Sequence, residues 1–210
     1  MLFRGSSIID ILVTIAVVLI SLSVRQTAHG YMAYILGDDT AKSMGRLSLN
    51  PLKHIDIIGF LMMLVAGFGW ANAVPVNMYR FKNPKKGMAL TSLAGPVSNI
   101  LLALICCFAI YILAKFNIYN EILFYFLQMM FYANTSLAMF NLIPIPPLDG
   151  SKILFALLPD RYYSKLMYLE RYGFIILILI INTPIFNRVL SNGVYNLQKA
   201  LISFVEIFIH

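Results

Sequence analysis

The sequence predicts an all-α polytopic membrane protein with four to six transmembrane or membrane-embedded helices and a small irregular or β-hairpin insertion. Of its 210 residues, 60% are hydrophobic and only 12% are charged, and the mean hydropathy is +0.80, which excludes a water-soluble domain. The net charge of +7 comes from cations scattered through the loops between apolar runs. Because Lys and Arg in such loops set membrane topology, we expect the lipid bilayer as environment and no nucleic-acid partner.

Four apolar runs predict the membrane helices, since roughly 17 to 25 residues suffice to cross a bilayer. They cover about Ile8–Leu36, Ile55–Trp70, Met88–Leu113 and Ile122–Leu142. The first run is longer than a bilayer requires, so that helix can tilt or project beyond the hydrocarbon. The second is short and contains several glycines, so it can enter the membrane without crossing it.

The segment Ala71–Lys86, between the second and third runs, alternates weakly and contains two prolines. It is therefore predicted to be an irregular loop or a small hairpin. The segment contains four cations, Arg80, Lys82, Lys85 and Lys86. If the second run crosses the membrane, these cations predict that the segment lies on the cytosolic side.

The fourth run ends at three prolines, which lack amide donors and forbid a regular helix. They are Pro144, Pro146 and Pro147. Backbone freed from a helix at membrane depth must be buried in protein or line a wet cavity, so this turn places Asp149 in an internal pocket. The alternative is that Asp149 only caps a helix starting at Ser151.

The rest of the chain belongs to the same single domain, residues 1–210. Several tyrosines and charges in Arg161–Arg171 are typical of the membrane surface. Phe174–Ile185 is short for a membrane span, and Val194–His210 is expected to be an amphipathic or terminal membrane helix. Residues 161–210 are therefore predicted to form interfacial and terminal membrane helices. The adjacent Cys106 and Cys107 are interpreted as packing residues. The first span is expected to remain as a signal-anchor.

The window Arg25-Gln26-Thr27-Ala28-His29 places ionisable side chains inside the first apolar run, where they usually mark function. Positions 25 and 29 lie one turn apart on one helix face. In the pattern His-Glu-x-x-His, two such histidines bind zinc and the Glu activates a metal-bound water. Here only His29 remains, because Arg25 has no lone pair to donate and Gln26 cannot accept a proton at neutral pH.

Further motifs follow in a fixed order along the chain. They are Gly37-Asp38, Gly45 to Asp56, Gly69-Trp70-Ala71, Val74-Pro75-Val76-Asn77, Asn83-Pro84, Gly87 to Leu90, Ala94-Gly95-Pro96 with Ser98-Asn99, and Asn141 to Gly150. In this order and spacing, residues from about 24 to 158 resemble the short bacterial branch of the site-2 protease family, which are intramembrane zinc metalloproteases with a His-Glu-x-x-His motif.

The resemblance implies a set of roles. His29 corresponds to the second histidine ligand of zinc and Asp149 to its aspartate ligand, while Asn141 corresponds to an asparagine that supports the substrate or transition state. Arg25 stands in the place of the other ligand, and Gln26 in that of the general base. Zinc is thus the implied cofactor, a membrane-spanning protein segment the implied substrate or partner, and a bacterial cytoplasmic membrane the implied location.

With no metal to neutralise it, Asp149 needs a partner, because a buried carboxylate is costly when unpaired. We expect Arg25 to occupy the vacated position and to form a bidentate ion pair with Asp149, with His29 alongside. The alternative is that Arg25 reaches a water-filled cavity and pairs with nothing. His54 and Asp56 could instead supply a replacement metal pair, but their surroundings favour a helix start at a membrane edge.

These observations leave three functional interpretations. We favour a catalytically inactive relative that binds membrane helices through the retained cleft, whether its motif changes are natural or engineered. Alternatives are an active intramembrane zinc metalloendopeptidase with a noncanonical site and, from another class, a small membrane transporter or channel using Arg25 and Asp149 as a polar path. Zinc is therefore expected to be absent or weakly bound.

Overall fold

The computed structural model describes residues 7–56, 59, 72–159 and 170–209, which form helices and no strand. The helices, in chain order, are α1 (Ile8–Ile35), α2 (Thr40–Ser43), η1 (Pro51–Lys53), η2 (Met78–Arg80), α4 (Pro84–Lys115), α5 (Glu121–Leu142), α6 (Asp149–Leu157), α8 (Gly173–Ile181) and α9 (Pro184–Ile209). Among them, α1, α4 and α5 are long and apolar enough to cross a membrane, and α8 with α9 could form one further, bent span. The prediction of an all-α, multi-pass membrane protein is confirmed.

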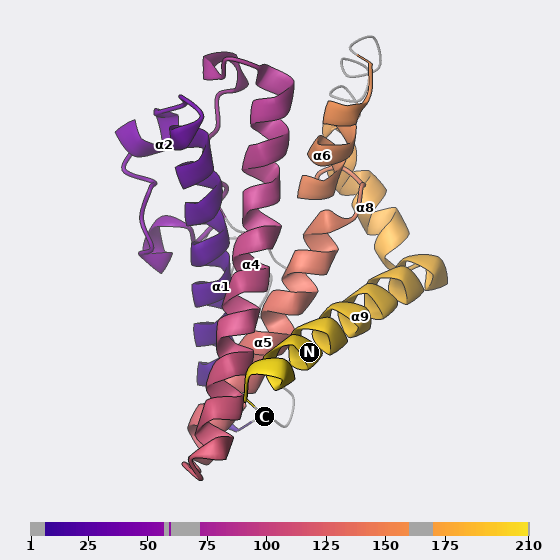
Figure 1. Cartoon of the computed structure of the whole chain (residues 1–210). Helices are drawn as coiled ribbons and strands as arrows, with labels where there is room; N and C mark the ends of the chain where they lie inside the picture. The colour runs from indigo at the N-terminus through magenta and orange to yellow at the C-terminus, as the bar shows by residue number, and fades with distance from the viewer. Residues whose placement is uncertain (1–6, 57–58, 60–71, 160–169, 210) are drawn as a thin grey trace.

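Helices α1, α4 and α5 pack side by side, and α9 crosses α5 and α4 obliquely (Figure 1). Their contact forms an apolar core that includes Val17, Ala103, Met130 and Val205. Cys106 and Cys107 are buried free thiols in this core, as predicted for packing residues. The core thus fixes the three long helices relative to one another below the site.

A layer of polar side chains crosses the bundle just above this core. Asn134 of α5 accepts a hydrogen bond from Asn99 of α4 (2.6 Å) and donates one to Ser21 of α1 (2.9 Å), and all three residues are fully buried. Polar groups inside a membrane protein must bond to one another, so this layer ties the three helices together in one rotational setting.

Three helix ends differ from the sequence predictions by four residues or more, and one of them is the end of α8 at Ile181, where Ile185 was predicted. Helix α4 begins at Pro84 and not at Met88, because Asn83 caps it by accepting the amide of Lys86 and proline suits the first helical position. Helix α9 begins at Pro184, ten residues before the predicted Val194. It is bent by 86° relative to α8 at the break before Pro184.

Between α2 and α4, the described residues form the short 3₁₀ helices η1 and η2 and are otherwise irregular. Asp38 is buried and accepts the amide of Asn77 (2.6 Å), which fixes the segment before η2 against the end of α1. The amide of Asn72 donates to the carbonyl of His54 (2.9 Å). Most of the predicted second run, Ile55–Trp70, and of Arg161–Arg171 lies outside the described residues.

Candidate functional site

The candidate site lies where α1, α5 and α6 meet. Arg25 and His29 share a face of α1, Asn141 is near the end of α5, and Asp149 is the first residue of α6. The proline-rich turn between α5 and α6 includes a cis bond before Pro147. Since α6 starts at Asp149, and the preceding residue makes no side-chain cap, the interpretation of Asp149 as the cap of a helix starting at Ser151 is wrong.

One nitrogen of Arg25 joins the two other elements. Its Nη2 lies 2.6 Å from Oδ2 of Asp149 and 2.6 Å from Oδ1 of Asn141. The amide nitrogen of Asn141 donates to the carbonyl of Leu137 (2.7 Å), which leaves its oxygen facing the guanidinium. Arg25 therefore contacts Asp149 as expected. The expected bidentate ion pair is wrong, because a single nitrogen, Nη2, contacts Asp149 and also donates to Asn141.

His29 faces Asp149 with its other ring nitrogen held by the backbone. Its Nδ1 lies 2.8 Å from the carbonyl of Thr91 in α4, and its Nε2 lies 3.3 Å from Oδ2 of Asp149. A carbonyl partner places the proton of a neutral imidazole on Nδ1 and leaves Nε2 as a lone-pair donor. Histidines that bind metals are commonly oriented in this way.

Two glycines allow these elements to approach. A Cβ at Gly95 in α4 would lie under 3.0 Å from the ring of His29, and one at Gly150 in α6 would lie as close to the backbone of Leu142. Real Cβ atoms do not adopt such distances. The glycines are therefore needed for the packing of α4 on α1 and of α6 on α5.

The electrostatics of the site favour the charged form of Asp149. Burial by itself raises the pKa of this carboxyl, but its contacts with His29 and with the positively charged Arg25 outweigh burial and lower the pKa to about 2. The carboxylate and the guanidinium together leave the pair without net charge. This is the arrangement by which a protein tolerates two ionised groups in its interior.

Gln26 is buried on α1, with 6% of its surface exposed. Within the described part of the chain, its side chain makes no hydrogen bond to the other four candidate residues. The structure therefore brings Arg25, His29, Asn141 and Asp149 together, with Gln26 beside them in the chain.

The suggested replacement pair, His54 and Asp56, bonds to the backbone instead. Nε2 of His54 lies 2.6 Å from the carbonyl of Ser48, and Oδ1 of Asp56 accepts the amide of Gly59 (2.8 Å), a bond typical of a helix N-cap. More generally, no three His, Cys, Asp or Glu side chains among the described residues are grouped so that they could hold a metal ion.

Sequence reasoning missed two contributors to the site. The carbonyl of Thr91 orients His29, and a backbone atom leaves no signal in a sequence. In the polar layer, Asn99 belongs to a motif quoted above, but its partners Ser21 and Asn134 were missed, although their spacing was readable: Ser21 lies one turn before Arg25, and Asn134 lies two turns before Asn141.

Comparisons with known proteins assign the sequence to a family. The model of peptidase family M50 matches residues 113–180. The chain is 42% identical to the putative zinc metalloprotease YwhC of Bacillus subtilis over 177 residues, which cover 82% of this chain and 81% of that protein. It is 31% identical to the putative zinc metalloprotease Rip2 of Mycolicibacterium smegmatis over 187 residues, covering 84% and 69% of the two chains.

A shorter match to the putative zinc metalloprotease MJ0611 of Methanocaldococcus jannaschii is 36% identical over 101 residues, 47% of this chain and 49% of that protein. No solved structure matches the chain. The extent of the identity to YwhC, with the family model matching the segment that contains Asn141 and Asp149, shows that the chain belongs to peptidase family M50, the site-2 proteases.

Proposed function

We propose that this member of the site-2 protease family binds membrane-spanning protein segments in the family's cleft without hydrolysing them, in the cytoplasmic membrane of a bacterium. One observation carries the proposal: Nη2 of Arg25 lies 2.6 Å from the Asp149 carboxylate and 2.6 Å from Asn141. These contacts support the proposal that the arginine stands in place of the family's metal and that its charge replaces that of the metal.

The residues present do not suit zinc. Zinc in proteins commonly has three or four ligands from Cys, His and carboxylates. Among the residues that the structure describes at this site, His29 and Asp149 are the donors of that kind, 3.3 Å apart, and the same Asp149 oxygen already accepts from Arg25. A guanidinium cannot donate a lone pair, and its positive charge repels a dication, so a metal would have to displace it.

The site also lacks a general base at the usual position. Gln26 is a carboxamide and does not accept a proton at neutral pH. Loss of the ligand and of the base removes both the polarisation of a substrate carbonyl and the activation of a water molecule, which are the two contributions such a site makes to hydrolysis.

Active zinc-dependent proteolysis is the second candidate. The orientation of His29 by the carbonyl of Thr91 favours it, because that geometry leaves Nε2 available as a ligand. The curated relatives are themselves named putative zinc metalloproteases. This function would require a ligand and a base other than Arg25 and Gln26.

Metal analysis separates the two candidates. We expect the purified chain to contain substoichiometric zinc, and the double revertant Arg25→His/Gln26→Glu to contain one zinc per chain. In liposomes, the unaltered chain should bind a labelled transmembrane peptide without cleaving it. Stoichiometric zinc in the unaltered chain, together with chelator-sensitive cleavage, would overturn the proposal.

A further inference from the structure

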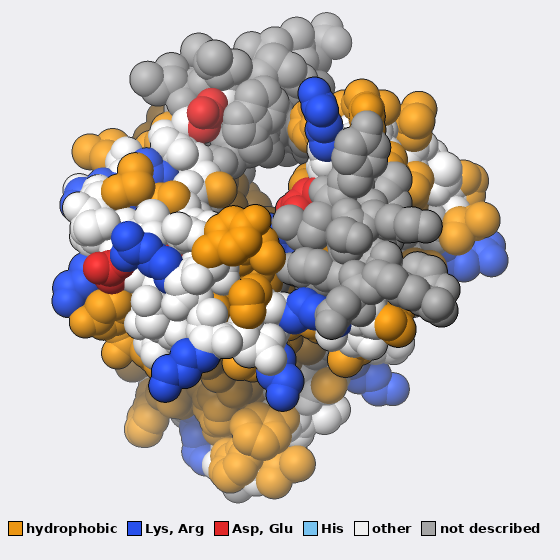
Figure 2. Space-filling view, turned by 90° about the horizontal axis from the view of Figure 1, so that it is seen from above, with side chains coloured by type: hydrophobic (Ala, Val, Ile, Leu, Met, Phe, Trp, Pro, Cys, Tyr) orange, Lys and Arg blue, Asp and Glu red, His pale blue; other side chains and the backbone are white. Residues whose placement is uncertain are grey.

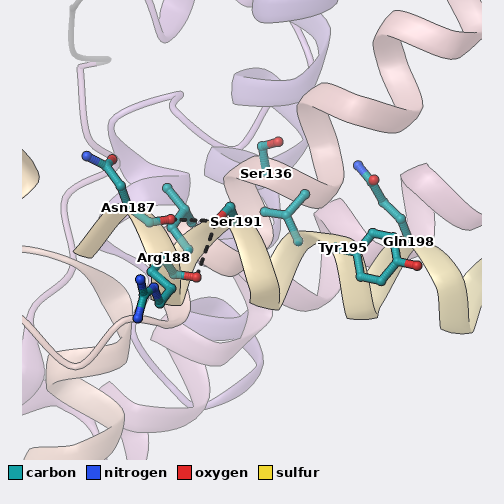
Figure 3. Close-up of a pocket in the computed structure, with 8 residues that line it drawn as sticks. Ser136, Asn187, Arg188, Ser191, Tyr195 and Gln198 are labelled. Atoms are coloured by element: carbon teal, nitrogen blue, oxygen red, sulfur yellow. Dashed lines mark hydrogen bonds between the residues drawn. The ribbon is translucent and has the colours of Figure 1, made fainter. Parts of the chain in front are cut away.

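A polar stripe runs along the exposed side of α9. It consists of Arg188, Ser191, Asn192, Tyr195, Asn196 and Lys199, which are all exposed. Their spacing of three or four residues places them on one side of the helix. Beside the stripe lies an open groove of about 560 Å³, lined by polar residues of α9, by the apolar Leu190 and Val194 of the same helix and by Ser136 of α5 (Figure 3).

The stripe lies alongside a membrane-spanning helix. The ring of Phe186 packs edge-on against Phe140 of α5 (6.2 Å between centroids), and Gln198 donates to Thr135 of α5 (2.9 Å). Both contacts fall within Glu121–Leu142, one of the candidate spans. Acyl chains offer no hydrogen-bond partners to amides, hydroxyls or a guanidinium, so a stripe at this depth needs a covering surface.

The positive charge of the stripe favours a partner with a negative charge. Arg188 and Lys199 are its charged members, and neither forms an ion pair with any residue that the structure describes. The one acidic residue of α9, Glu206, accepts a hydrogen bond from Tyr111 (2.9 Å). Two copies of this stripe would bring like charges together, so a second copy of the chain is a poor occupant.

We propose that the α9 stripe and its groove bind a membrane helix of another protein that carries a carboxylate facing Arg188. The hydroxyl of Tyr195 and the amides of Asn192 and Asn196 are then available to polar groups of that helix. This surface lies on α9 and is separate from the Arg25 site, so the inference does not depend on the proposed function.

The test uses a synthetic probe of known chemistry: a Leu-rich membrane peptide with one central Glu, compared with peptides carrying Gln or Leu at that position. Binding to the labelled full chain is measured by energy transfer in phosphatidylcholine vesicles at pH 8. We expect the Glu peptide to bind about tenfold more tightly than the Leu peptide. Arg188→Leu should abolish this preference, and Lys82→Leu, which removes an exposed cation outside both surfaces, should retain it.

Several outcomes would overturn the inference. Equal binding of the Glu and Leu peptides, or a preference that Arg188→Leu leaves unchanged, would contradict the role of Arg188. Energy transfer between copies of the chain that Arg188→Leu removes would mean that the surface binds a second copy. An Arg188-dependent preference for anionic lipid in place of the peptide would mean that the surface binds lipid. Because Arg188 is exposed and forms no ion pair within the described part of the chain, its substitution should leave the thermal unfolding midpoint unchanged, so that loss of binding is not loss of fold.

Discussion

Arg25 satisfies two partners at once, and this explains why an arginine is tolerated inside the first apolar helix. An arginine at the centre of a membrane helix costs about 2.5–3.5 kcal/mol on insertion scales. The contacts to Asp149 and Asn141, each 2.6 Å, offset this cost and leave no unpaired carboxylate. Each charge of the pair therefore makes the other acceptable.

We predict that Arg25 and Asp149 are energetically coupled. Arg25→Leu and Asp149→Asn should each destabilise the chain by about 3–5 kcal/mol, because each substitution leaves the other member of the pair as a buried, unpaired charge. The double variant should lose less than the sum of the two by about 1–3 kcal/mol, because the second substitution removes a partner that is already missing. Unfolding in mild detergent measures all three variants.

Lys82→Leu serves as the control for this cycle, because Lys82 is an exposed cation outside the site. Its combination with Asp149→Asn should be additive within about 0.5 kcal/mol. Additivity of Arg25→Leu with Asp149→Asn would contradict the ion pair.

For single residues, the sequence predicted the contacts that charge determines. A buried Asp149 that lacked a metal needed a cation, and Arg25 stood in the place of the missing ligand. What the sequence could not supply were contacts made by backbone atoms, such as the carbonyl of Thr91 that holds His29. The sharing of one Arg25 nitrogen by Asn141 and Asp149 depends on where α5 ends, which sequence patterns do not fix at this precision.

Among the helices, the contact of α4 with α1 depends on the absence of a side chain at Gly95. We predict that Gly95→Ala destabilises the chain by about 1–3 kcal/mol, as overpacking of a filled interior does, because the new Cβ meets the His29 ring. Gly193→Ala in α9 is the matched control, since there the new Cβ meets only the terminal methyl of Met139, which can move. Equal effects of the two substitutions on thermal unfolding would contradict this account.

The polar layer below the site holds α1, α4 and α5 together. Asn134→Ala and Asn99→Ala should be coupled by about 0.6 kcal/mol and at most about 1.7 kcal/mol, the range for hydrogen bonds between membrane helices. A double-mutant cycle on unfolding free energy measures the coupling. Ser136→Ala lies on the same helix but lines the groove beside α9, and it should show no coupling to Asn99→Ala. Coupling of the control pair would mean that the effect is not specific to the bond.

Helix existence was easier to predict than helix ends. The long apolar runs gave α1 and α5 to within one residue of their bounds. The start of α4 was misplaced because the cap at Asn83 and the proline after it lie among polar loop residues, outside the apolar run. The start of α9 was misplaced because polar and apolar residues are mixed among its first ten residues, and hydropathy alone does not separate such a stretch from a loop.

In the molecule as a whole, charge is distributed unequally between the two ends of the bundle. The carboxyl end of α1 and the amino end of α4 lie at the same end (Figure 1). Between Ile8 and Leu142, the described cations at this end are Lys42, Arg46, Lys53, Arg80, Lys82, Lys85 and Lys86, whereas Lys115 lies at the other. Seen from above, Lys and Arg side chains are spread widely over this end (Figure 2).

This asymmetry predicts the orientation of the chain in the membrane. Loops rich in Lys and Arg stay on the cytosolic side during insertion, so the end that contains Lys82 and lies nearer the Arg25 site should face the cytosol. A cysteine introduced at position 82 should react with a membrane-impermeant maleimide in inside-out vesicles and not in intact cells. Tyr119→Cys, exposed at the opposite end after α4, should react in intact cells.

The unaltered chain controls for background, because Cys106 and Cys107 are buried in the core and should not be labelled from either side. Labelling of position 82 from outside intact cells would reverse the orientation and open the Arg25 site toward the outer leaflet. Labelling of both introduced positions from one side would mean that α4 does not cross the membrane, although it is a 32-residue apolar helix.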